Sequence, residues 1–396
     1  MIHLAPHFVP RGVSGPLLAT ARPAILHLID ELQVGGAQTH LVSMLREARA
    51  RFDVDHRVVV LFGDGPVGGQ LREMGIEVDV LDLRPHLGRR RFLAASRILA
   101  DLMREHRPDL VEAHLTWSRL LGLYAAWREG VPRRIGFEQG DVYLNSWKFR
   151  VANQIGQHFA ERIVVCSEAL ADWNRRTHGI SLARLEVMHC CIDLDRFQPR
   201  QGGPAPIVFG LPAGTTVFGA VGTLGRGVNK RTDVAIRAVA AARSMGGNVG
   251  LVICGDGEQR AELEALAEGL GIAGFVPFLG TRADIPEILA SCDAFCHAAP
   301  FEPFGIVCIE AMAVGLPVVV PNSGGIREAV DDGVTGLIYE ALDHEALARH
   351  MIRLHERPDL RRSMGEAGRL AAIERFSVGD YVDRLYRLYG LDRRAS

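Results

Sequence analysis

The chain has 396 residues, which is too long for one hydrophobic core and predicts two domains of fewer than 200 residues each. Its formal net charge of -2 excludes a global electrostatic attraction to nucleic acid. The hydrophobic content of 48%, with 43 glycines and 19 prolines, favours an α/β protein with many tight turns between strands and helices.

The first half of the chain alternates short apolar runs with helical periods. Residues 1–23 carry four prolines and no long apolar run, so we expect an N-terminal extension and not a signal peptide. Near-continuous apolar runs are typical of parallel strands covered on both faces, and residues 24–200 therefore predict a doubly wound, Rossmann-like domain. The expected strands are Ala24–Ile29, Arg57–Phe62, Glu77–Leu83, Asp109–Leu115, Arg134–Phe137, Ile163–Ser167 and Leu185–His189, with helices such as Gln38–Arg51, Gly69–Met74 and Phe92–Arg104 between them.

The pattern breaks at Phe197–Pro206, which we interpret as a linker, and then restarts. Residues 201–376 predict a second Rossmann-like domain, and residues 377–396 a C-terminal helix that can pack back on the first domain. Two such domains in tandem predict a cleft between their strand ends, where these sheets bind ligands. The expected strands are Val217–Val221, Val249–Cys254, Val276–Leu279, Ala294–His297, Pro317–Pro321 and Leu337–Tyr339.

Cysteine usage and hydropathy favour a cytoplasmic protein. The seven cysteines mostly sit in apolar runs and form no metal-type Cys-x-x-Cys pair, so we expect a reducing compartment and no structural metal. No apolar run reaches the roughly 18–20 residues that a membrane span requires. The basic run at Arg84 and Arg89–Arg91 is most simply a solvated helix start, although it also fits a peripheral contact with the inner membrane face.

The segment from His297 to Val320 contains a strand end, a turn and the start of a helix. This arrangement places backbone N–H groups of residues 304–307 at a helix N-terminus, where anions are favoured. Glu302 and Glu310 flank that terminus. Because a phosphate repels carboxylates, we expect both to bind hydroxyl groups of a sugar or a ribose. A glycosidase pair fits less well, since its carboxylates oppose each other across the scissile bond, roughly 5–10 Å apart.

Two further features suggest phosphate or sugar chemistry, whereas a lone histidine at a strand end, such as His114, is more often a structural residue. Lys230 is one of only two lysines in a chain with 45 basic residues, and its ammonium group is suited to neutralise a leaving diphosphate. Gly35 and Gly36 lie between the first strand and its helix, where glycine lets backbone amides approach a ligand closely. His114 ends an expected strand at the same edge of the sheet.

These motifs resemble the retaining GT-B glycosyltransferases of family 4, the glycogen-synthase-like and sucrose-synthase-like group. The Glu-x7-Glu arrangement within residues 297–319 resembles the family signature, and residues 221–230 resemble its diphosphate loop. Other similar segments are 35–38, 108–114, 255–257, 279–282, 324–328 and 332–336, so that the resemblance covers about residues 24 to 385. It implies a GT-B fold, in which two Rossmann-like domains face an interdomain cleft.

The resemblance also implies an activity and a set of site residues. It implies transfer of a hexose, with retention of configuration, from a nucleoside-diphosphate sugar to an acceptor hydroxyl bound by the first domain. UDP is favoured over GDP, and no metal or other cofactor is implied. The implied catalytic residues are His114, Lys230 and Glu302. The expected donor-binding residues are Gly35, Gly36, Arg226, Arg231, Arg282, Phe304, Gly305, Ile306, Val307 and Glu310.

The diphosphate loop departs from the family pattern. The family usually has an arginine where Thr223 stands, and this loop is two residues longer between Gly222 and Lys230. Arg226 and Arg231 are therefore alternatives for a second diphosphate clamp, because a guanidinium pairs well with phosphate.

Two other functions remain as alternatives. One is a sugar-nucleotide 2-epimerase of the GT-B type, which would act on a UDP-sugar without an acceptor. The other is a catalytically silent GT-B protein that binds a partner. The presence of Lys230, Glu302 and Glu310 argues against the silent protein. The acceptor, the donor sugar and the oligomeric state do not follow from the sequence.

Overall fold

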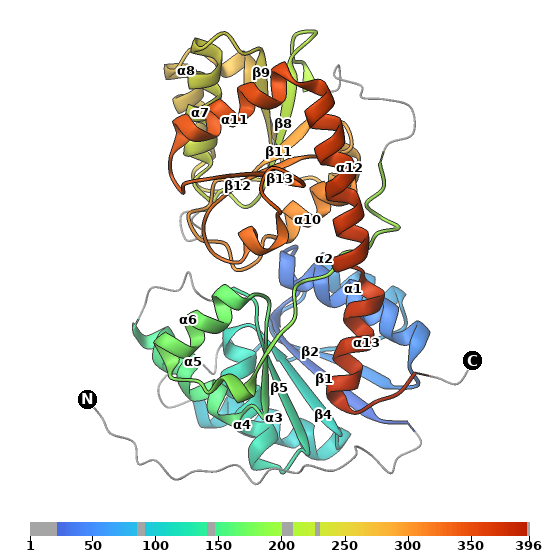
Figure 1. Ribbon diagram of the computed structural model, residues 1–396. Coiled ribbons are helices and arrows are strands. Elements are labelled where there is room, and N and C mark those ends of the chain that lie inside the picture. The colour runs from blue at the N-terminus through green and yellow to red at the C-terminus, as the bar shows by residue number, and fades with distance from the viewer. Residues whose placement is uncertain (1–21, 85–91, 141–146, 200–208, 226–229, 394–396) are drawn as a thin grey trace. The chain divides into compact units, whose positions relative to one another are not determined.

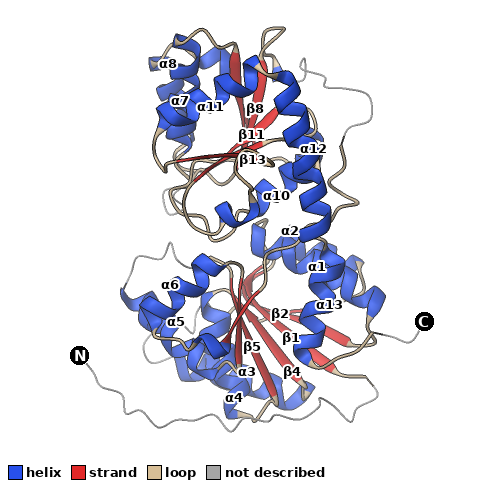
Figure 2. Cartoon of the chain, in the orientation of Figure 1, coloured by secondary structure: helices blue, strands red, loops and turns tan. Residues whose placement is uncertain are grey.

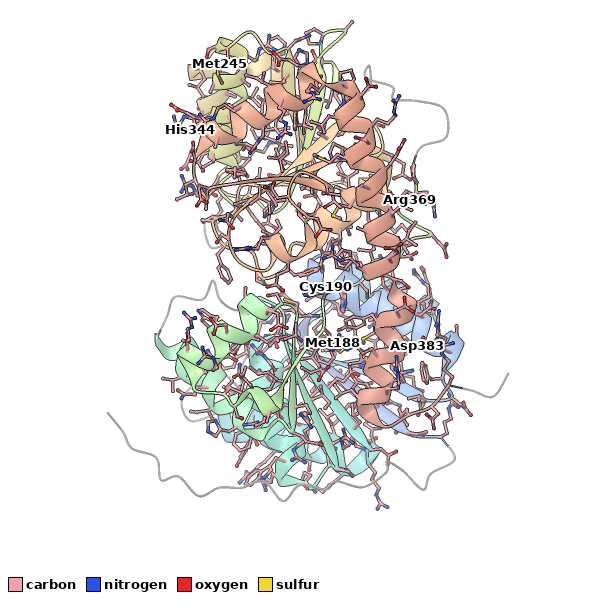
Figure 3. All side chains as sticks on the ribbon, viewed as in Figure 1. Met188, Cys190, Met245, His344, Arg369 and Asp383 are labelled. Carbon is pink, nitrogen blue, oxygen red and sulfur yellow. The ribbon has the colours of Figure 1, made fainter. Side chains whose placement is uncertain are left out.

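The computed structural model describes residues 22–84, 92–140, 147–199, 209–225 and 230–393. The chain forms two compact α/β units, shown in Figure 1 and by secondary structure in Figure 2. The first unit comprises Met1–Val165, Ala171–Met188 and Tyr381–Ser396, and the second comprises Cys166–Leu170 and His189–Asp380. The chain passes from the first unit to the second between Met188 and Cys190, which are both labelled in Figure 3.

The first unit is built on a seven-stranded sheet with the order β3-β2-β1-β4-β5-β6-β7, and every strand pair in it is parallel. Its strands are β1 (Ala24–Glu31), β2 (Asp55–Gly63), β3 (Glu77–Val80), β4 (Leu110–His114), β5 (Arg133–Glu138), β6 (Arg162–Val165) and β7 (Leu185–Val187). Its helices are α1 (Gly36–Arg51), α2 (Pro66–Glu73), α3 (Phe92–His106), η2 (Ser118–Gly122), α4 (Leu123–Arg128), α5 (Trp147–Phe159), α6 (Glu168–His178), whose first three residues belong to the second unit, and η4 (Leu182–Arg184).

The second unit repeats this plan with a six-stranded parallel sheet of order β10-β9-β8-β11-β12-β13. Its strands are β8 (Thr216–Val221), β9 (Val249–Cys254), β10 (Phe278–Gly280), β11 (Ala294–Cys296), β12 (Val318–Pro321) and β13 (Gly336–Tyr339). Its helices are α7 (Thr232–Ser244), α8 (Arg260–Gly269), η6 (Ala273–Phe275), α9 (Ile285–Leu289), α10 (Ile306–Ala313), η7 (Ile326–Ala329), α11 (His344–Glu356) and α12 (Pro358–Arg375), after which α13 (Val378–Tyr389) leads into the first unit.

This architecture confirms the predicted fold class of two Rossmann-like domains. Each expected strand is present, because buried parallel strands need the continuous apolar runs that the sequence contains. In each sheet the strand order reverses once, between β1 and β4 in the first unit and between β8 and β11 in the second. Open parallel sheets bind ligands beside the carboxyl ends of strands at such a reversal. The fold therefore marks one candidate edge in each unit.

The interior of each unit is apolar, and the thiols are part of it. The seven cysteines are all buried, and none of them forms a disulfide. None of the helices in the described part of the chain is both long enough and apolar enough to cross a membrane. The expected extension at residues 1–23 lies almost wholly outside the described residues, as do Arg89–Arg91 of the basic run and most of the expected linker.

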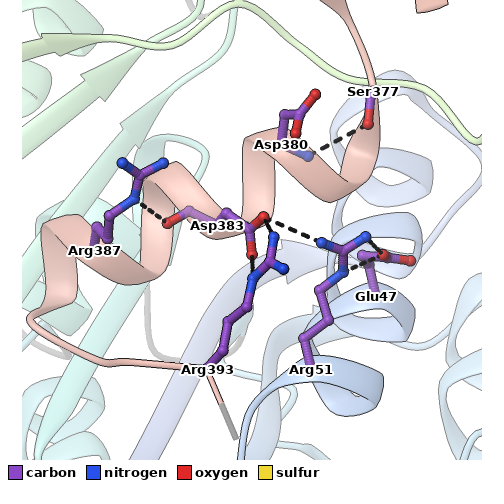
Figure 4. A network of polar contacts seen from close by, with 7 residues as sticks. All are labelled: Glu47, Arg51, Ser377, Asp380, Asp383, Arg387 and Arg393. Atoms are coloured by element: carbon purple, nitrogen blue, oxygen red, sulfur yellow. Dashed lines mark hydrogen bonds and ion pairs between the residues drawn. The ribbon is translucent and has the colours of Figure 1, made fainter. Parts of the chain in front are cut away.

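Helix α13 is fastened to the first unit by a group of charged residues, shown in Figure 4. Arg51 of α1 donates to Asp383 Oδ2 at 3.1 Å, and Arg51 is also paired with Glu47 one turn earlier. Arg393, which follows the helix, donates to the same carboxylate through its Nε at 2.7 Å and through its Nη2. Asp383 is buried and is the shared acceptor of two arginines from different segments.

We expect the substitution Asp383→Ala to weaken the docking of α13. Hydrogen bonds to charged groups contribute about 1.5–3 kcal/mol, but both arginines retain contact with water, so the expected loss is about 1–2 kcal/mol of unfolding free energy. Chemical denaturation of the full chain measures this loss. The control Asp380→Ala removes an exposed carboxylate from the same helix and should change the unfolding free energy by less than about 0.5 kcal/mol. Equal losses in the two variants would contradict the assigned role.

Candidate functional site

Glu302 lies on the loop after β11, and two side chains share its carboxylate. Lys230 Nζ donates to Glu302 Oε2 at 2.6 Å, and His297 Nε2 lies 3.0 Å from the same oxygen. Lys230 comes from the loop between β8 and α7, and His297 directly follows β11. The strand reversal of the second sheet therefore brings together two residues that the sequence predicts for the site, Lys230 and Glu302, and adds His297.

The Glu302 carboxylate is ionised because its donors outweigh its burial. Burial raises the pKa of Glu302, but the charge of Lys230 and the hydrogen bond from His297 lower it by more. The resulting pKa is about 2. An ionised carboxylate only accepts hydrogen bonds, so His297 Nε2 carries a proton. The backbone carbonyl of His297 in turn accepts a hydrogen bond from Tyr339 Oη at 2.9 Å, which anchors the strand end.

The backbone around Glu302 is held by a glycine loop that follows β12. The amide N–H of Gly325 donates to Glu302 O at 2.8 Å. Gly324 has φ +63°, and a Cβ at this position would lie 2.3 Å from Glu302 O. Because an L side chain disfavours this φ and the neighbouring atom is backbone, only glycine fits here without moving Glu302.

Helix α10 begins directly after the loop that carries Glu302, and its N-terminus can bind an anion. Its N-cap, Gly305, has φ +82° and provides no side-chain cap, so the first amides of the helix, at Ile306 and Val307, have no acceptor within it. Phe304 is buried and stacks on His189, with ring centroids 5.1 Å apart and an interplanar angle of 20°. The preceding residue thus anchors the helix start in the core.

His189 is itself held by a carboxylate that sequence reasoning did not assign to the site. Glu328 Oε2 lies 3.1 Å from His189 Nε2, and the two Glu328 oxygens accept hydrogen bonds from the backbone N–H groups of Glu168 at 2.9 Å and Ala169 at 2.8 Å. Glu328 therefore fixes the His189 ring that stacks on Phe304, and it caps the start of α6. Its segment is among those that resemble the family, but no local pattern indicates which distant amides it meets.

A small pocket lies beside Lys230 at the carboxyl ends of β8, β9 and β11. Its volume of about 20 Å³ is enough for one water molecule. Gly222 and Lys230 line one side, and His297 lines another. The loops after β8 and β9 meet here backbone to backbone, since a Cβ on Gly255, whose φ is +143°, would lie 1.9 Å from Gly222 O. Glycine at position 255 therefore lets the two loops approach each other closely.

The arginines expected to bind the donor are paired with nearby aspartates. Arg231 donates to Asp233 through two nitrogens, at 2.8 and 2.9 Å, and Arg282 pairs in the same way with Asp284, at 2.7 and 2.5 Å. A phosphate must compete with these carboxylates for either guanidinium. Arg226 lies outside the described residues.

Glu310 lies on α10, and its pKa is shifted in the opposite direction to that of Glu302. It is half-buried, and burial raises its pKa to about 7, against a lowering by the charge of Arg196. Near neutral pH its carboxyl group is therefore populated in both protonation states. The two glutamates of one motif thus differ in charge because only Glu302 has a direct cationic partner.

In the first unit, the predicted residues lie at the corresponding edge. Gly35 is the N-cap of α1 and Gly36 its first residue, and no side chain caps this helix start. His114 is the fully buried last residue of β4, which pairs with β1. The strand reversal of the first sheet therefore places Gly35, Gly36 and His114 at the carboxyl ends of neighbouring strands.

One group of buried side chains in the described part of the chain has the composition of a metal site. His27, Glu112 and His114 each offer a ligand atom, and these atoms lie within 4.8 Å of one another. Glu112 Oε2 is 2.8 Å from His27 Nδ1 and 3.3 Å from His114 Nε2, so hydrogen bonds account for the contacts. The sequence offered no signal for this group beyond His114, because its members come from two strands far apart in the chain.

We expect Gly324→Ala to destabilise the protein more than an alanine at a glycine with similar φ. Gly333, which has φ +77° and no atom within 4 Å of the place that a Cβ would take, is the matched control. Both variants pay about 1–2 kcal/mol for the left-handed conformation, whereas Gly324→Ala must also displace the Glu302 backbone. Denaturant unfolding should show an additional loss of at least about 1 kcal/mol for Gly324→Ala. Equal losses of unfolding free energy in the two variants would mean that the Glu302 backbone can move away from the new Cβ without destabilising the protein.

The Glu302 pKa predicts a defined acid dependence of stability. A folded pKa of about 2, against an ordinary value of 4.5, stabilises the fold above about pH 4.5 by up to about 3 kcal/mol, and this contribution is lost as the pH falls towards 2. The difference in unfolding free energy between wild type and Glu302→Gln should therefore be constant from pH 5 to 7 and shrink below pH 4.5. The exposed control Glu345→Gln should show no such convergence. A pH-independent gap for Glu302→Gln would argue against the ionised pair.

Comparison with known proteins identifies the family. The model named Glycosyltransferase Family 4 matches residues 34–196, and the model named Glycosyl transferases group 1 matches residues 208–371. A D-inositol 3-phosphate glycosyltransferase of Saccharomonospora viridis is 30% identical over 71% of this chain and 69% of its own length. An alpha-maltose-1-phosphate synthase of Mycolicibacterium smegmatis is 29% identical over 90% of this chain and 95% of its own length.

Solved structures give the same result. The Anabaena protein HepE in complex with UDP and glucose has a TM-score of 0.81 and 25% identity, covering 93% of this chain and 99% of that protein. HepE in complex with UDP-glucose has a TM-score of 0.80 and 26% identity, over 92% and 99% of the two chains. The sucrose-phosphate synthase of Thermosynechococcus elongatus shares the fold, with a TM-score of 0.74 at 18% identity. The chain therefore belongs to the family 4, group 1 glycosyltransferases of the GT-B fold, which use nucleotide-sugar donors.

Proposed function

We propose that this protein is a retaining glycosyltransferase that moves a hexose from a UDP-sugar to an acceptor hydroxyl. The observation that carries the proposal is the contact between Lys230 and Glu302 beside the start of α10, at the strand reversal of the second sheet. A cation, a helix N-terminus and a hydroxyl acceptor at one sheet edge suit a sugar diphosphate. The choice of UDP is supported by the complexes of HepE with UDP-glucose.

In this proposal Lys230 binds the diphosphate of the donor. Its side chain is 22% exposed, so a ligand can reach the ammonium group while Glu302 holds it in place at 2.6 Å. As the glycosidic bond breaks, negative charge grows on the leaving diphosphate. The Lys230 ammonium and the amides of Ile306 and Val307 then stabilise that charge more strongly than in the ground state, which accelerates the reaction.

Glu302 orients the sugar rather than attacking it. Its Oε2 is occupied by Lys230 and His297, and we assign Oε1 to a hydroxyl of the sugar ring. An ionised carboxylate accepts a hydrogen bond from a hydroxyl and repels phosphate, so the group separates the sugar end of the donor from its diphosphate end. The loop that holds Glu302 supplies the rigidity that such positioning needs.

Glu310 and the first unit complete the proposed assignment. With a pKa near 7, Glu310 can both accept from and donate to the ribose hydroxyls of the nucleotide. Gly35 and Gly36 of the first unit, at an uncapped helix start, are proposed to contact the donor through their amides, and His114 to contact the sugar. Three arginines remain candidates for donor binding, namely Arg226, Arg231 and Arg282. For Arg231 and Arg282, the phosphate must compete with the paired aspartates Asp233 and Asp284.

We propose further that the transfer requires no divalent cation, because Lys230 and the helix amides supply the positive charge that a metal would otherwise provide. Activity should then persist in excess chelator. Retention predicts a product with the same anomeric configuration as the donor, which the anomeric coupling constant of the product reports.

The Lys230→Ala variant tests the proposal directly. UDP-glucose at 100 times its dissociation constant should stabilise the wild type by about 2.7 kcal/mol. Loss of the ammonium should weaken donor binding about 10- to 100-fold and reduce kcat about 100-fold or more, measured by thermal shift, calorimetry and turnover. The control Arg260→Ala removes a partly exposed cation of α8 that pairs with Asp256 and Glu264, and it should leave both quantities within about twofold.

Two outcomes would overturn this assignment. One is that UDP-, GDP- and ADP-sugars all fail to protect the folded wild type. The other is that Lys230→Ala binds UDP-glucose as well as the wild type does. Epimerised product from UDP-N-acetylglucosamine without an acceptor would instead identify an isomerase.

A further inference from the structure

Glu112, in the centre of the first sheet, joins a network of buried side chains of which the proposed function uses only His114. The carboxylate accepts hydrogen bonds from His27 Nδ1 at 2.8 Å and His114 Nε2 at 3.3 Å, both at Oε2. Tyr389 Oη, from helix α13, donates to Oε1. Glu112, His27, His114 and Tyr389 are all fully buried. A buried carboxylate is stable only when donors surround it, and these three groups supply them.

The network continues from His27 to two further side chains. His27 Nε2 lies 3.0 Å from His56 Nδ1, and His56 Nε2 lies 3.3 Å from Tyr386 Oη. Because an ionised Glu112 can only accept, His27 Nδ1 carries a proton. Burial lowers the pKa of His56 to about 3, so its ring is neutral near pH 7. Each ring nitrogen of His27 and His56 has a hydrogen-bond partner.

The same argument determines the tautomer of His114. Its Nε2 faces Glu112 and must carry the proton, so its Nδ1 bears a lone pair. Burial lowers the pKa of His114, which keeps the ring neutral. The ring stacks on Phe137 at 4.5 Å with an interplanar angle of 24°, which opposes rotation. Nδ1 is buried and, within the described parts of the chain, has no hydrogen-bond partner.

A second buried acceptor without a hydrogen-bond partner among the described residues belongs to Gln139, directly after β5. His114 pairs with Phe137 of β5, and Gln139 follows two residues later. Gln139 Nε2 lies 3.3 Å from His40 Nδ1, which accepts its proton, while Gln139 Oε1 is buried with no partner among the residues that the structure describes. Leu115, next to His114, has φ +66°, a conformation costly for a non-glycine residue and common at functional sites.

We propose that Glu112 is a positioning residue that fixes His114 as its Nε2–H tautomer, so that His114 Nδ1 and Gln139 Oε1 accept hydrogen bonds from hydroxyl groups of a neutral sugar. This inference rests on the proposed function, since it takes a sugar as the ligand of this edge. The sugar can belong to the nucleotide donor or to the acceptor, because both present the same hydroxyl chemistry. Neither Glu112 nor Gln139 contacts the reacting atoms.

The arrangement makes the edge selective for hydroxyl groups over anionic groups. A hydroxyl donates a proton to a lone pair, whereas a carboxylate at the same place has no proton to donate and meets two acceptors. Buried acceptors that are left unmatched cost more than a lost contact between exposed groups. A neutral hexose is therefore favoured over the corresponding uronic acid.

The tautomer is measurable without any ligand. Histidine-selective ¹⁵N labelling of the full chain and long-range proton–nitrogen correlation distinguish an Nε2–H ring from an Nδ1–H ring, with the signal assigned by its loss in His114→Phe. We expect a neutral Nε2–H ring in the wild type. In Glu112→Gln the amide can accept or donate, so both tautomers should be populated. The matched control Tyr386→Phe removes one buried hydroxyl from the same helix but no contact to Glu112, and it should retain the wild-type tautomer.

Ligand titrations then identify the source of the sugar. UDP, UDP-glucose and free glucose are added to the labelled wild type. A shift of the His114 Nδ1 signal with UDP-glucose but not UDP or glucose identifies the donor sugar, and a shift with glucose alone identifies an acceptor sugar. When the shift identifies the donor sugar, UDP-glucose should bind at least about tenfold more tightly than UDP-glucuronate to the wild type, and Glu112→Gln should reduce this ratio towards one while binding UDP equally well. When it identifies an acceptor sugar, the same comparison is made between glucose and glucuronate.

Several results would overturn the inference. An Nδ1–H or charged His114 ring in the wild type would do so even if Glu112→Gln does not fold, and so would an unchanged tautomer in a folded Glu112→Gln. A His114 signal that responds to none of the three ligands would also refute it. Failure of UDP-glucose to bind at all, with the expected tautomer present, would instead refute the proposed function.

Discussion

A buried carboxylate that must be matched by hydrogen-bond donors lies at the candidate ligand edge of each unit. In the second unit this group is Glu302, which accepts hydrogen bonds from Lys230 and His297; in the first it is Glu112, which accepts them from two histidines and a tyrosine. Leaving either charge unmatched would cost several kcal/mol, so the surrounding side chains have little freedom. Both carboxylates lie at or beside the strand where their sheet reverses its order. The matched carboxylate of each unit therefore lies at the edge where open parallel sheets bind ligands.

The two glutamates of the Glu-x7-Glu motif show how strongly the environment separates identical side chains. Glu302 has a lysine at 2.6 Å and a pKa of about 2, whereas burial without such a partner raises that of Glu310 to about 7. One group is therefore a permanent acceptor, and the other can exchange a proton near neutral pH. This difference suits a ligand with a charged diphosphate between two sets of hydroxyl groups.

Helix α13 contributes to the first unit in two ways. Asp383 fastens it by accepting from Arg51 and Arg393, and Tyr389 donates to Glu112 from the same helix. The end of the chain is therefore part of the buried network behind His114. In the second unit, Glu328 has the comparable task of holding His189 beneath Phe304. In both cases a side chain distant in the sequence stabilises a residue next to the ligand edge.

The sequence by itself determined the two Rossmann-like sheets, the strands within them and the glycine-rich turns, because apolar period and glycine position are local properties of the chain. It also singled out Lys230, because lysine is rare in this chain, and Glu302, because it belongs to the Glu-x7-Glu motif. Only the tertiary structure decided that these two side chains touch, that Glu112 faces His27 of another strand, and that Tyr389 of α13 donates to the same carboxylate. Such contacts depend on strand order and side-chain direction. Strand order is set when the whole sheet assembles, and no local pattern encodes it.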